Sequence, residues 1–247
     1  MNTAEHYANI AEHYDPSFLG ADHARWERDH IISHLRLQQT DRVLDLGAGT
    51  GAFASQLYQK AGLSNPVIAI EPSQPMLDQA KTVPGLIPYC TDALSFVINT
   101  DIRYDKVLMK GMIHHVPKKN LPVLYRAIYH QLLLGGIALT MTRPHVVPYP
   151  FFEAAHKVWS DHQPPFNEFG EEMERAGFLV SCHAYDYPVA IEKMQWFSFI
   201  RNRYWSTFSY FSNEEIEEGI QEIETQYPEE DVLSFTDTIL LLEAVKQ

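Results

Sequence analysis

Short apolar runs alternate with longer segments of helical character between Arg42 and Thr142. Such an alternation of strand and helix predicts a parallel sheet with helices on both of its faces. Pro88 interrupts the third apolar run, and because proline cannot donate to a sheet ladder, this strand is expected at the edge of the sheet. The predicted strands span residues 43–46, 67–70, 86–89, 107–109 and 137–141, and the predicted helices span residues 51–61, 72–81 and 120–133.

The pattern becomes irregular after Thr142. Residues 143–166 are rich in proline and aromatic side chains, which predicts a loop with a short helix. The remaining chain is expected to form a helix at 170–176, a sixth strand at 177–187, a helical segment at 191–230 and a seventh strand at 238–245. Apolar positions in residues 1–40 have spacings compatible with two further helices.

A glycine-rich loop joins the first predicted strand to the helix that follows it. The segment reads DLGAGTG from Asp45 to Gly51. Glycines at this spacing allow a tight turn with no Cβ between the backbone amides and a ligand, and the helix adds its free N–H groups. The loop also satisfies the dinucleotide fingerprint Gly47-x-Gly49-x-x-Ala52, but the carboxylate of Asp45 suits an ammonium group better than a pyrophosphate. An NAD-linked function remains the alternative at this point.

Four further segments extend the similarity of this loop to one family. They read VIAIEPS at 67–73, TDA at 91–93, YDKVLMKGMIHHV at 104–116 and LLLGGIALTMT at 132–142. In this order they resemble the class I S-adenosylmethionine-dependent methyltransferases, with most similarity to the ubiquinone-biosynthesis-like and trans-aconitate-type branches. The resemblance implies a doubly wound α/β sheet of seven mostly parallel strands, the Rossmann-like methyltransferase fold, with the last strand antiparallel between the fifth and sixth.

The resemblance also implies S-adenosylmethionine as the cofactor, with no metal. Asp45 and the loop are expected to hold its methionine end, Glu71 the ribose, and Met76 and Asp92 the adenine. Tyr7 and Tyr14 lie two helical turns apart, so both are candidates to face the methionine end, or else to pack the first helix onto the core. The predicted cofactor-binding residues are Tyr14, Asp45, Gly47, Ala48, Gly49, Glu71, Met76, Asp92, Ala93 and Lys110.

Three segments outside the sheet are expected to cover the site. Residues 1–40 resemble the N-terminal helical lid of the family, and residues 143–170 and 191–230 form substrate-cap insertions within a single domain, 1–247. Arg25 is either a ligand of the cofactor carboxylate or a surface residue. The cap is rich in aromatic side chains and carries the last two arginines of the chain, and an arginine among aromatic rings is suited to anchor a carboxylate. The predicted acceptor-binding residues are Trp159, Trp196, Arg201, Arg203 and Tyr204; core packing and an ion pair with the neighbouring acidic segment are the alternatives.

His114 and His115 are the predicted catalytic residues. They follow the fourth strand, and histidine accepts protons near neutral pH. Only one of the two is expected to point straight into the pocket, and the other to hydrogen-bond the backbone. Methyl transfer needs an aligned acceptor, a dry site and, for some acceptors, a base.

Net charge limits the classes of partner, and cysteine content indicates the compartment. A formal net charge of −13 repels DNA and anionic membranes and disfavours RNA. Nine acidic residues between positions 214 and 231 are expected to form a solvated helix face. Two cysteines far apart suit buried thiols in a reducing compartment, so we expect a cytoplasmic protein. It is expected to be a monomer or a homodimer.

These patterns predict an S-adenosylmethionine-dependent methyltransferase that acts on an oxygen or nitrogen of a small-molecule acceptor. A tRNA-modifying methyltransferase and a cofactor-binding partner protein without catalytic activity are the alternatives.

Overall fold

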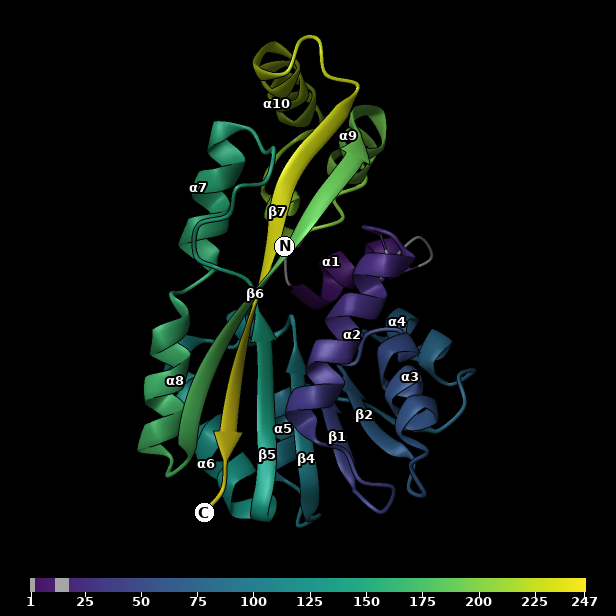
Figure 1. Ribbon diagram of the computed structural model, residues 1–247, viewed down its shortest axis with the longest axis vertical. Helices are drawn as coiled ribbons and strands as arrows, with labels where there is room; N and C mark the ends of the chain where they lie inside the picture. The colour runs from purple at the N-terminus through teal and green to yellow at the C-terminus, as the bar shows by residue number, and fades with distance from the viewer. Residues whose placement is uncertain (1–2, 12–17) are drawn as a thin grey trace.

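The computed structural model describes residues 3–11 and 18–247. Seven strands form one sheet in the order β3-β2-β1-β4-β5-β7-β6 (Figure 1). Strands β1 to β5 run parallel, and β7 lies antiparallel between β5 and β6. The antiparallel position of β7 between β5 and β6 and the edge position of β3 are as predicted. The strands are β1 Val43–Leu46, β2 Val67–Glu71, β3 Leu86–Cys90, β4 Tyr104–Lys110, β5 Leu132–Thr142, β6 Leu179–Glu192 and β7 Val232–Val245.

Helices cover both faces of the sheet, because each buries an apolar stripe against it. On one face, Ile31, Leu35 and Leu57 of α2 and α3 pack on the sheet, and on the other face α5, α6 and α8 do so. The helices are α1 Thr3–Ile10, α2 Ala21–Leu35, α3 Ala52–Ala61, α4 Gln74–Ala80, α5 Ala93–Ile98, α6 Leu121–Gln131, α7 Glu153–His162, α8 Phe166–Arg175, α9 Lys193–Arg201 and α10 Asn213–Gln226, and short 3₁₀ helices include Ile113–His115 and Ser206–Tyr210.

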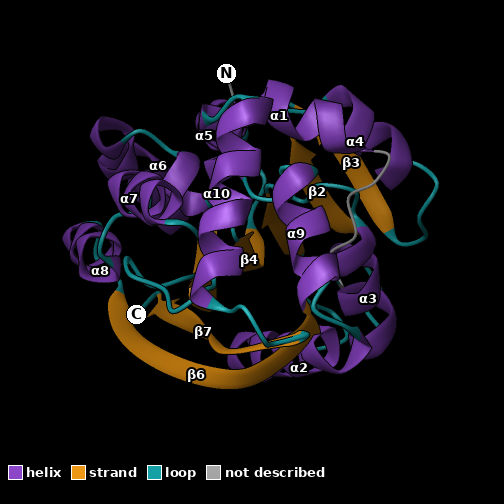
Figure 2. Ribbon diagram, turned by 90° about the horizontal axis from the view of Figure 1, so that it is seen from above, coloured by secondary structure: helices purple, strands orange, loops and turns teal. Residues whose placement is uncertain are grey.

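A cap rises beyond the carboxyl ends of the parallel strands. It consists of α7, α9, α10 and the ends of β6 and β7 that extend past the sheet (Figure 1). Seen from above, α9 and α10 lie over the sheet (Figure 2). The cap has its own apolar cluster, which includes the fully buried Trp196, Ile200 and Phe208. A capping box between Ser212 and Glu215 begins α10, whose buried isoleucines face this cluster while its glutamates stay exposed, as predicted for the acidic segment.

Several predicted boundaries were wrong. β6 and β7 pair with each other from Leu179↔Val245 to Glu192↔Val232, so both strands are longer than predicted. The reason is that mutual pairing, rather than burial against the main core, maintains their outer halves. α8 begins at Phe166 and packs Phe169 on the sheet, so the end of the first predicted cap insertion belongs to the sheet layer.

The prediction of buried thiols was also wrong. Cys90 and Cys182 are both exposed, because they lie on the two edge strands, β3 and β6. Among the helices described, none has the length and apolar character needed to cross a membrane.

Candidate functional site

The glycine loop begins where β1 ends and is tied to the neighbouring strand. The amides of Gly47 and Ala48 both donate to the carbonyl of Ile70 on β2, at 2.8 and 2.9 Å. Gly47 has φ +77°, and a Cβ there would lie 2.8 Å from Met112 Cβ, so a side chain is excluded. Gly49 has φ +57° and nothing within 4 Å of where its Cβ would be. The loop is therefore packed at Gly47 and open to a ligand at Gly49.

A cavity of about 380 Å³, which we call the glycine-loop cavity, lies along the carboxyl ends of β1, β2 and β4. Most of the predicted cofactor residues line it: Gly47, Gly49, Glu71, Met76, Asp92, Ala93 and Lys110. Ala48 contributes the loop hydrogen bond to Ile70. Tyr14 lies outside the described residues, whereas Tyr7 on α1 lines the cavity. The open crevice at the switch in strand order is where ligands bind in such sheets.

Two acidic residues of this cavity are held by backbone groups. Glu71 accepts hydrogen bonds from the amides of Gly49, at 2.9 Å, and Ser73, at 2.8 Å, and burial raises the pKa of its carboxyl group. Asp92 caps α5 by accepting from the amide of Ser95 at 2.9 Å. Each carboxylate is thus fixed in place while keeping lone pairs for a ligand hydroxyl or amino group.

Asp45 is a buried acid on β1, two residues before Gly47, and it is not among the residues that line the glycine-loop cavity. It is 2% exposed, and its Oδ1 has no hydrogen-bond partner among the described residues. Burial raises its pKa to about 7, with Glu71 adding to the shift and Lys110 opposing it. A buried carboxylate oxygen without a partner is costly, and a ligand cation would supply the missing charge. Asp45 therefore suits the ammonium group predicted for it.

A second cavity of about 360 Å³, which we call the histidine cavity, lies between the sheet and the cap. It shares Tyr7, Lys110, Gly111 and His115 with the glycine-loop cavity, so the two cavities meet at the end of β4. The cap contributes Trp159 and Tyr204, as predicted, together with Trp205. Five of the twelve histidines of the chain line this cavity: His6, His23, His114, His115 and His162.

His114 and His115 form a ring pair in the 3₁₀ helix after β4. Their ring centroids are 3.9 Å apart, and both side chains line the histidine cavity. Both residues thus line the pocket, whereas only one of them was expected to point straight into it. His114 Nδ1 and His115 Nε2 are buried without a partner among the described residues. Burial lowers both pKa values, that of His115 to about 4, so both rings are neutral at pH 7.

A buried ionic network forms one wall of the histidine cavity. Arg143, directly after β5, donates to Asp237 on β7 at 2.8 and 3.0 Å and to Glu27 on α2 at 3.2 Å. Lys110 Nζ lies 2.8 Å from Glu27, and His23 Nε2 lies 2.7 Å from Asp237. Tyr149 donates its hydroxyl to Asp237 as well.

Opposite charges in this network outweigh the cost of burial. Burial alone would raise the pKa of Asp237, but Arg143 and the hydrogen bonds from His23 and Tyr149 hold it well below its usual range. The pKa of Glu27 is likewise lowered by Lys110 and Arg143 in spite of its burial. The wall is therefore polar, and its charged side chains are paired with one another.

Arg143, Asp237, Glu27 and His23 were not among the residues predicted for the site. A signal was present on α2, where His23, Glu27, Ile31 and Leu35 recur every four residues and are all buried. Two polar residues on an apolar helix stripe indicate buried partners elsewhere in the chain. The partners on β5 and β7 carry no local motif.

Three of the predicted acceptor-binding residues, Trp196, Arg201 and Arg203, do not line the histidine cavity, so this part of the prediction was wrong. Trp196 is fully buried in the cap and donates its indole N–H to the carbonyl of Pro150 at 2.7 Å. Arg201 forms two hydrogen bonds to Glu217 on α10, at 2.7 and 2.8 Å. Arg203 donates to the carbonyl of Phe211 and the side chain of Asn213. The physical reason is proximity, because α10 brings its carboxylates and its first turn directly to the end of α9.

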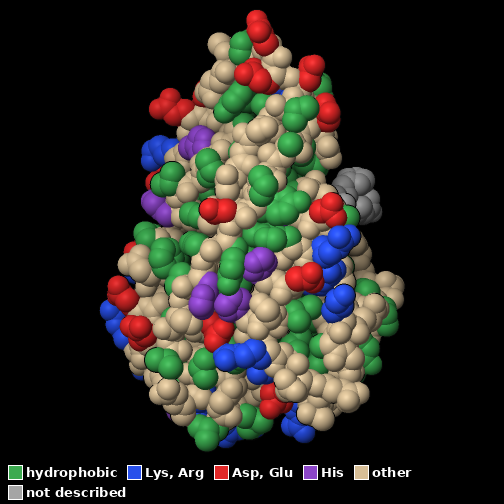
Figure 3. Space-filling model, viewed as in Figure 1, with side chains coloured by type: hydrophobic (Ala, Val, Ile, Leu, Met, Phe, Trp, Pro, Cys, Tyr) green, Lys and Arg blue, Asp and Glu red, His purple; other side chains and the backbone are tan. Residues whose placement is uncertain are grey.

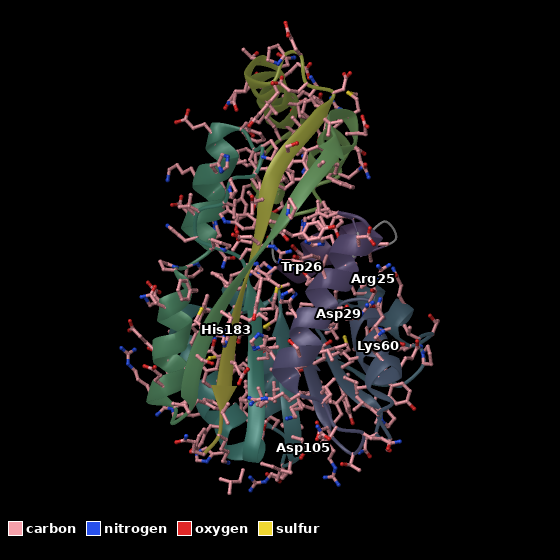
Figure 4. The ribbon with its side chains drawn as sticks, in the orientation of Figure 1. Arg25, Trp26, Asp29, Lys60, Asp105 and His183 are labelled. Carbon is pink, nitrogen blue, oxygen red and sulfur yellow. The ribbon has the colours of Figure 1, made fainter. Side chains whose placement is uncertain are left out.

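Arg25 is a surface residue. Its side chain is 62% exposed and pairs with Asp22 one turn earlier on α2. Figure 4 shows it on the outer side of this helix, with Asp29 and Lys60 nearby in the view. The possible contact of Arg25 with a cofactor carboxylate is therefore not supported.

Comparison with known proteins locates the best-matched part of the chain. Residues 43–136 match the family model described as a methyltransferase domain. A protein of Oceanobacillus iheyensis described as an uncharacterized methyltransferase is 26% identical over 202 residues, which cover 76% of this chain and 90% of that protein. The matched domain contains the glycine loop, Glu71, Asp92 and the histidine pair, and ends before the cap.

Solved structures share the fold. Phosphoethanolamine N-methyltransferase 2 of Haemonchus contortus, in complex with phosphomonomethylethanolamine and S-adenosylhomocysteine, superposes with a TM-score of 0.61 at 17% identity. The match covers 99% of this chain and 57% of that chain. An S-adenosylmethionine-dependent methyltransferase of Archaeoglobus fulgidus gives a TM-score of 0.60 at 15% identity, over 93% of this chain and 96% of the other.

Proposed function

We propose, from the premise that this chain is a class I S-adenosylmethionine-dependent methyltransferase, that it methylates an oxygen or nitrogen of a small-molecule acceptor bound in the histidine cavity. One observation carries the proposal: the two cavities share a wall made of Tyr7, Lys110, Gly111 and His115. In-line displacement requires the acceptor atom and the sulfonium to approach along one line with water excluded. Two cavities that meet at one point provide that approach.

The residues of the glycine-loop cavity fit the cofactor in their donor chemistry. S-adenosylmethionine supplies an activated methyl group on a sulfonium when it is bound. The unpaired oxygen of Asp45 suits the ammonium group, and Glu71 has lone pairs for the two ribose hydroxyls. Asp92 and the buried Met76 provide a polar and an apolar contact for the adenine.

His115 is the proposed proton acceptor. It lines both cavities, whereas His114 lines only the histidine cavity, so His115 is the imidazole nearer to the transfer point. Its lowered pKa keeps the ring neutral at pH 7, with a nitrogen ready to accept a hydrogen bond from a hydroxyl or ammonium group of the acceptor. His114 packs against it and limits its orientation.

The cap supports an acceptor that is small and partly aromatic or apolar. Trp159, Tyr204 and Trp205 provide ring faces on the cap side, and the Arg143 network provides polar groups on the sheet side. A cavity of about 360 Å³ is of the size of small-molecule sites. The net charge of −13 disfavours a nucleic-acid acceptor.

Turnover with a metabolite extract tests the proposal. Purified protein is incubated with S-adenosylmethionine and fractions of a metabolite extract, and released S-adenosylhomocysteine and methylated products are measured. We expect turnover with small-molecule fractions, its loss in His115→Ala, and no turnover with bulk tRNA. Turnover with tRNA alone would support the RNA-modifying alternative, and S-adenosylhomocysteine binding without turnover on any fraction would support a non-catalytic partner.

A further inference from the structure

A cluster of two histidines and a glutamate, side chains of the kinds that ligate metals, lies apart from both cavities, where α2 packs against β6 and β7. His34 of α2, His183 of β6 and Glu243 of β7 each offer one donor atom, and these atoms all lie within 4.8 Å of one another. Histidine side chains gather on this face of the molecule (Figure 3), and His183 is seen on β6 beside α2 (Figure 4). We propose that this cluster binds a divalent transition-metal ion of the zinc class.

The distances suit a first coordination shell. His34 Nδ1 and Glu243 Oε2 share a hydrogen bond of 2.9 Å, and a tetrahedral zinc ion that replaced its proton, with bonds of about 2.0 Å, would hold these two ligands roughly 3.3 Å apart. The His34 and His183 ring centroids are 4.5 Å apart. Ser181 pairs with Glu243 across the strands, and His183, two residues further on, therefore projects to the same face as Glu243. The donor atom of His183 lies within 4.8 Å of those of His34 and Glu243.

Neighbouring side chains orient two of the three ligands. Nε2 of His34 lies 2.9 Å from the hydroxyl of Tyr185, which leaves Nδ1 to face the ion. Arg36 donates to Oε1 of Glu243 and leaves Oε2 for a single metal bond. The contact of His34 with Tyr185 is typical of metal-binding histidines, which usually donate their other ring N–H to a fixed partner. The side chains of His34 and Glu243 are 11% and 14% exposed, so the ligands are sheltered but within reach of an ion from solvent.

The donor set selects the class of ion. Two imidazoles and one carboxylate suit Zn²⁺, Co²⁺, Ni²⁺ or Cu²⁺, whereas Mg²⁺ and Ca²⁺ prefer oxygen ligands alone. A water molecule would complete four-coordination.

An ion at this position would join α2 to the β6–β7 pair. The same helix carries His23 and Glu27 to the wall of the histidine cavity. Metal binding is therefore expected to stabilise the attachment of the helix that contributes these two side chains.

Metal titration of the full chain tests the site. The protein carries Cys90→Ser and Cys182→Ser so that the exposed thiols do not bind the ion, and it is stripped of metal before Zn²⁺ or Mg²⁺ is added. Calorimetry is expected to give one Zn²⁺ per chain, a raised unfolding midpoint and no response to Mg²⁺. His183→Ala and Glu243→Gln should each weaken Zn²⁺ binding by roughly tenfold or more, since even changes outside the ligand shell have effects of that order.

His30→Ala is the matched control. His30 lies one turn before His34 on α2 and contacts Tyr185, but it is not one of the three donors. Zn²⁺ affinity should be unchanged in this variant. Equal Zn²⁺ affinity in wild type and His183→Ala, or an equal loss in His30→Ala, would overturn the proposal. Co²⁺ absorption, which reports nitrogen and oxygen ligation directly, gives a second readout that does not depend on stability.

Discussion

The two cavities differ in how their charges are satisfied. At the glycine loop, the buried Asp45 two residues before Gly47 has an oxygen without a partner among the described residues, and the loop is open to the cavity at Gly49. In the wall of the histidine cavity, Arg143 and Lys110 are already paired with Asp237 and Glu27. The first cavity is prepared for a ligand that brings a positive charge. The second is stable by itself and offers mainly shape, imidazoles and aromatic rings.

This difference predicts separate consequences for substitutions in the two regions. Removing an unpaired group should weaken ligand binding while leaving the fold intact. Removing one partner of a closed network should leave a buried charge alone and therefore weaken the fold.

The largest effect is expected at the junction of the cavities. His115→Ala should lower turnover by about 10²- to 10⁴-fold once an acceptor is known, because a positioned proton acceptor contributes on this scale. S-adenosylhomocysteine affinity, measured by calorimetry, should stay near wild type. His114→Ala is the matched control, with a smaller loss of turnover expected; an equal loss in both variants together with equal destabilisation would indicate that the pair is structural.

Arg143→Met should lower the free energy of unfolding by about 3–5 kcal/mol, because it leaves Glu27 and Asp237 buried without their guanidinium partner. Urea denaturation measures the change. Arg201→Met removes a pair with Glu217 that is about half exposed on both sides, and it should cost at most about 1 kcal/mol. Similar losses in the two variants would contradict the contrast between the closed network and the surface pair.

Asp45→Asn should reduce S-adenosylhomocysteine affinity by about 1.5–3 kcal/mol, the usual range for a hydrogen bond to a charged group. The free energy of unfolding without ligand should be unchanged or higher, because the variant removes a buried carboxylate that has an unpaired oxygen. Calorimetry measures the expected fall in affinity, and denaturation measures the free energy of unfolding. A fall in stability with unchanged affinity would assign Asp45 to the fold rather than to the ligand.

The pKa of Asp45 gives the smallest predicted effect, a pH dependence. Burial raises this pKa to about 7, and only the ionised form attracts an ammonium group. Affinity for S-adenosylhomocysteine should therefore fall as the pH drops below about 7, by up to about tenfold per pH unit.

Folding stability should depend on the ionisation of Asp45 in the opposite direction. The folded pKa lies above the unfolded value of about 3.9, so ionisation costs stability as the pH rises from about 4 to about 7. Asp45→Asn should remove the contribution of Asp45 to the pH dependence of ligand affinity and to that of folding stability. Unchanged pH profiles in that variant would exclude Asp45 as their source.

Sequence alone determined the strand–helix alternation of residues 42–142, the edge strand and most of the glycine-loop cavity. The reason is that these features are local. The loop follows its strand within a few residues, and Glu71 and Asp92 come at or just after strand ends that a parallel sheet brings together at one edge. Pro88 excluded a central position for its strand without reference to any other part of the chain.

Tertiary structure alone decided which charged residues form the second cavity. His23 and Arg143 meet at Asp237 from 214 and 94 residues away, and no spacing rule connects them. Arg201 and Arg143 look alike in the sequence, yet one reaches a surface glutamate and the other a buried aspartate. Partner choice for a long side chain depends on which element folds next to it, and here that was set by the extension of β6 and β7 into the cap.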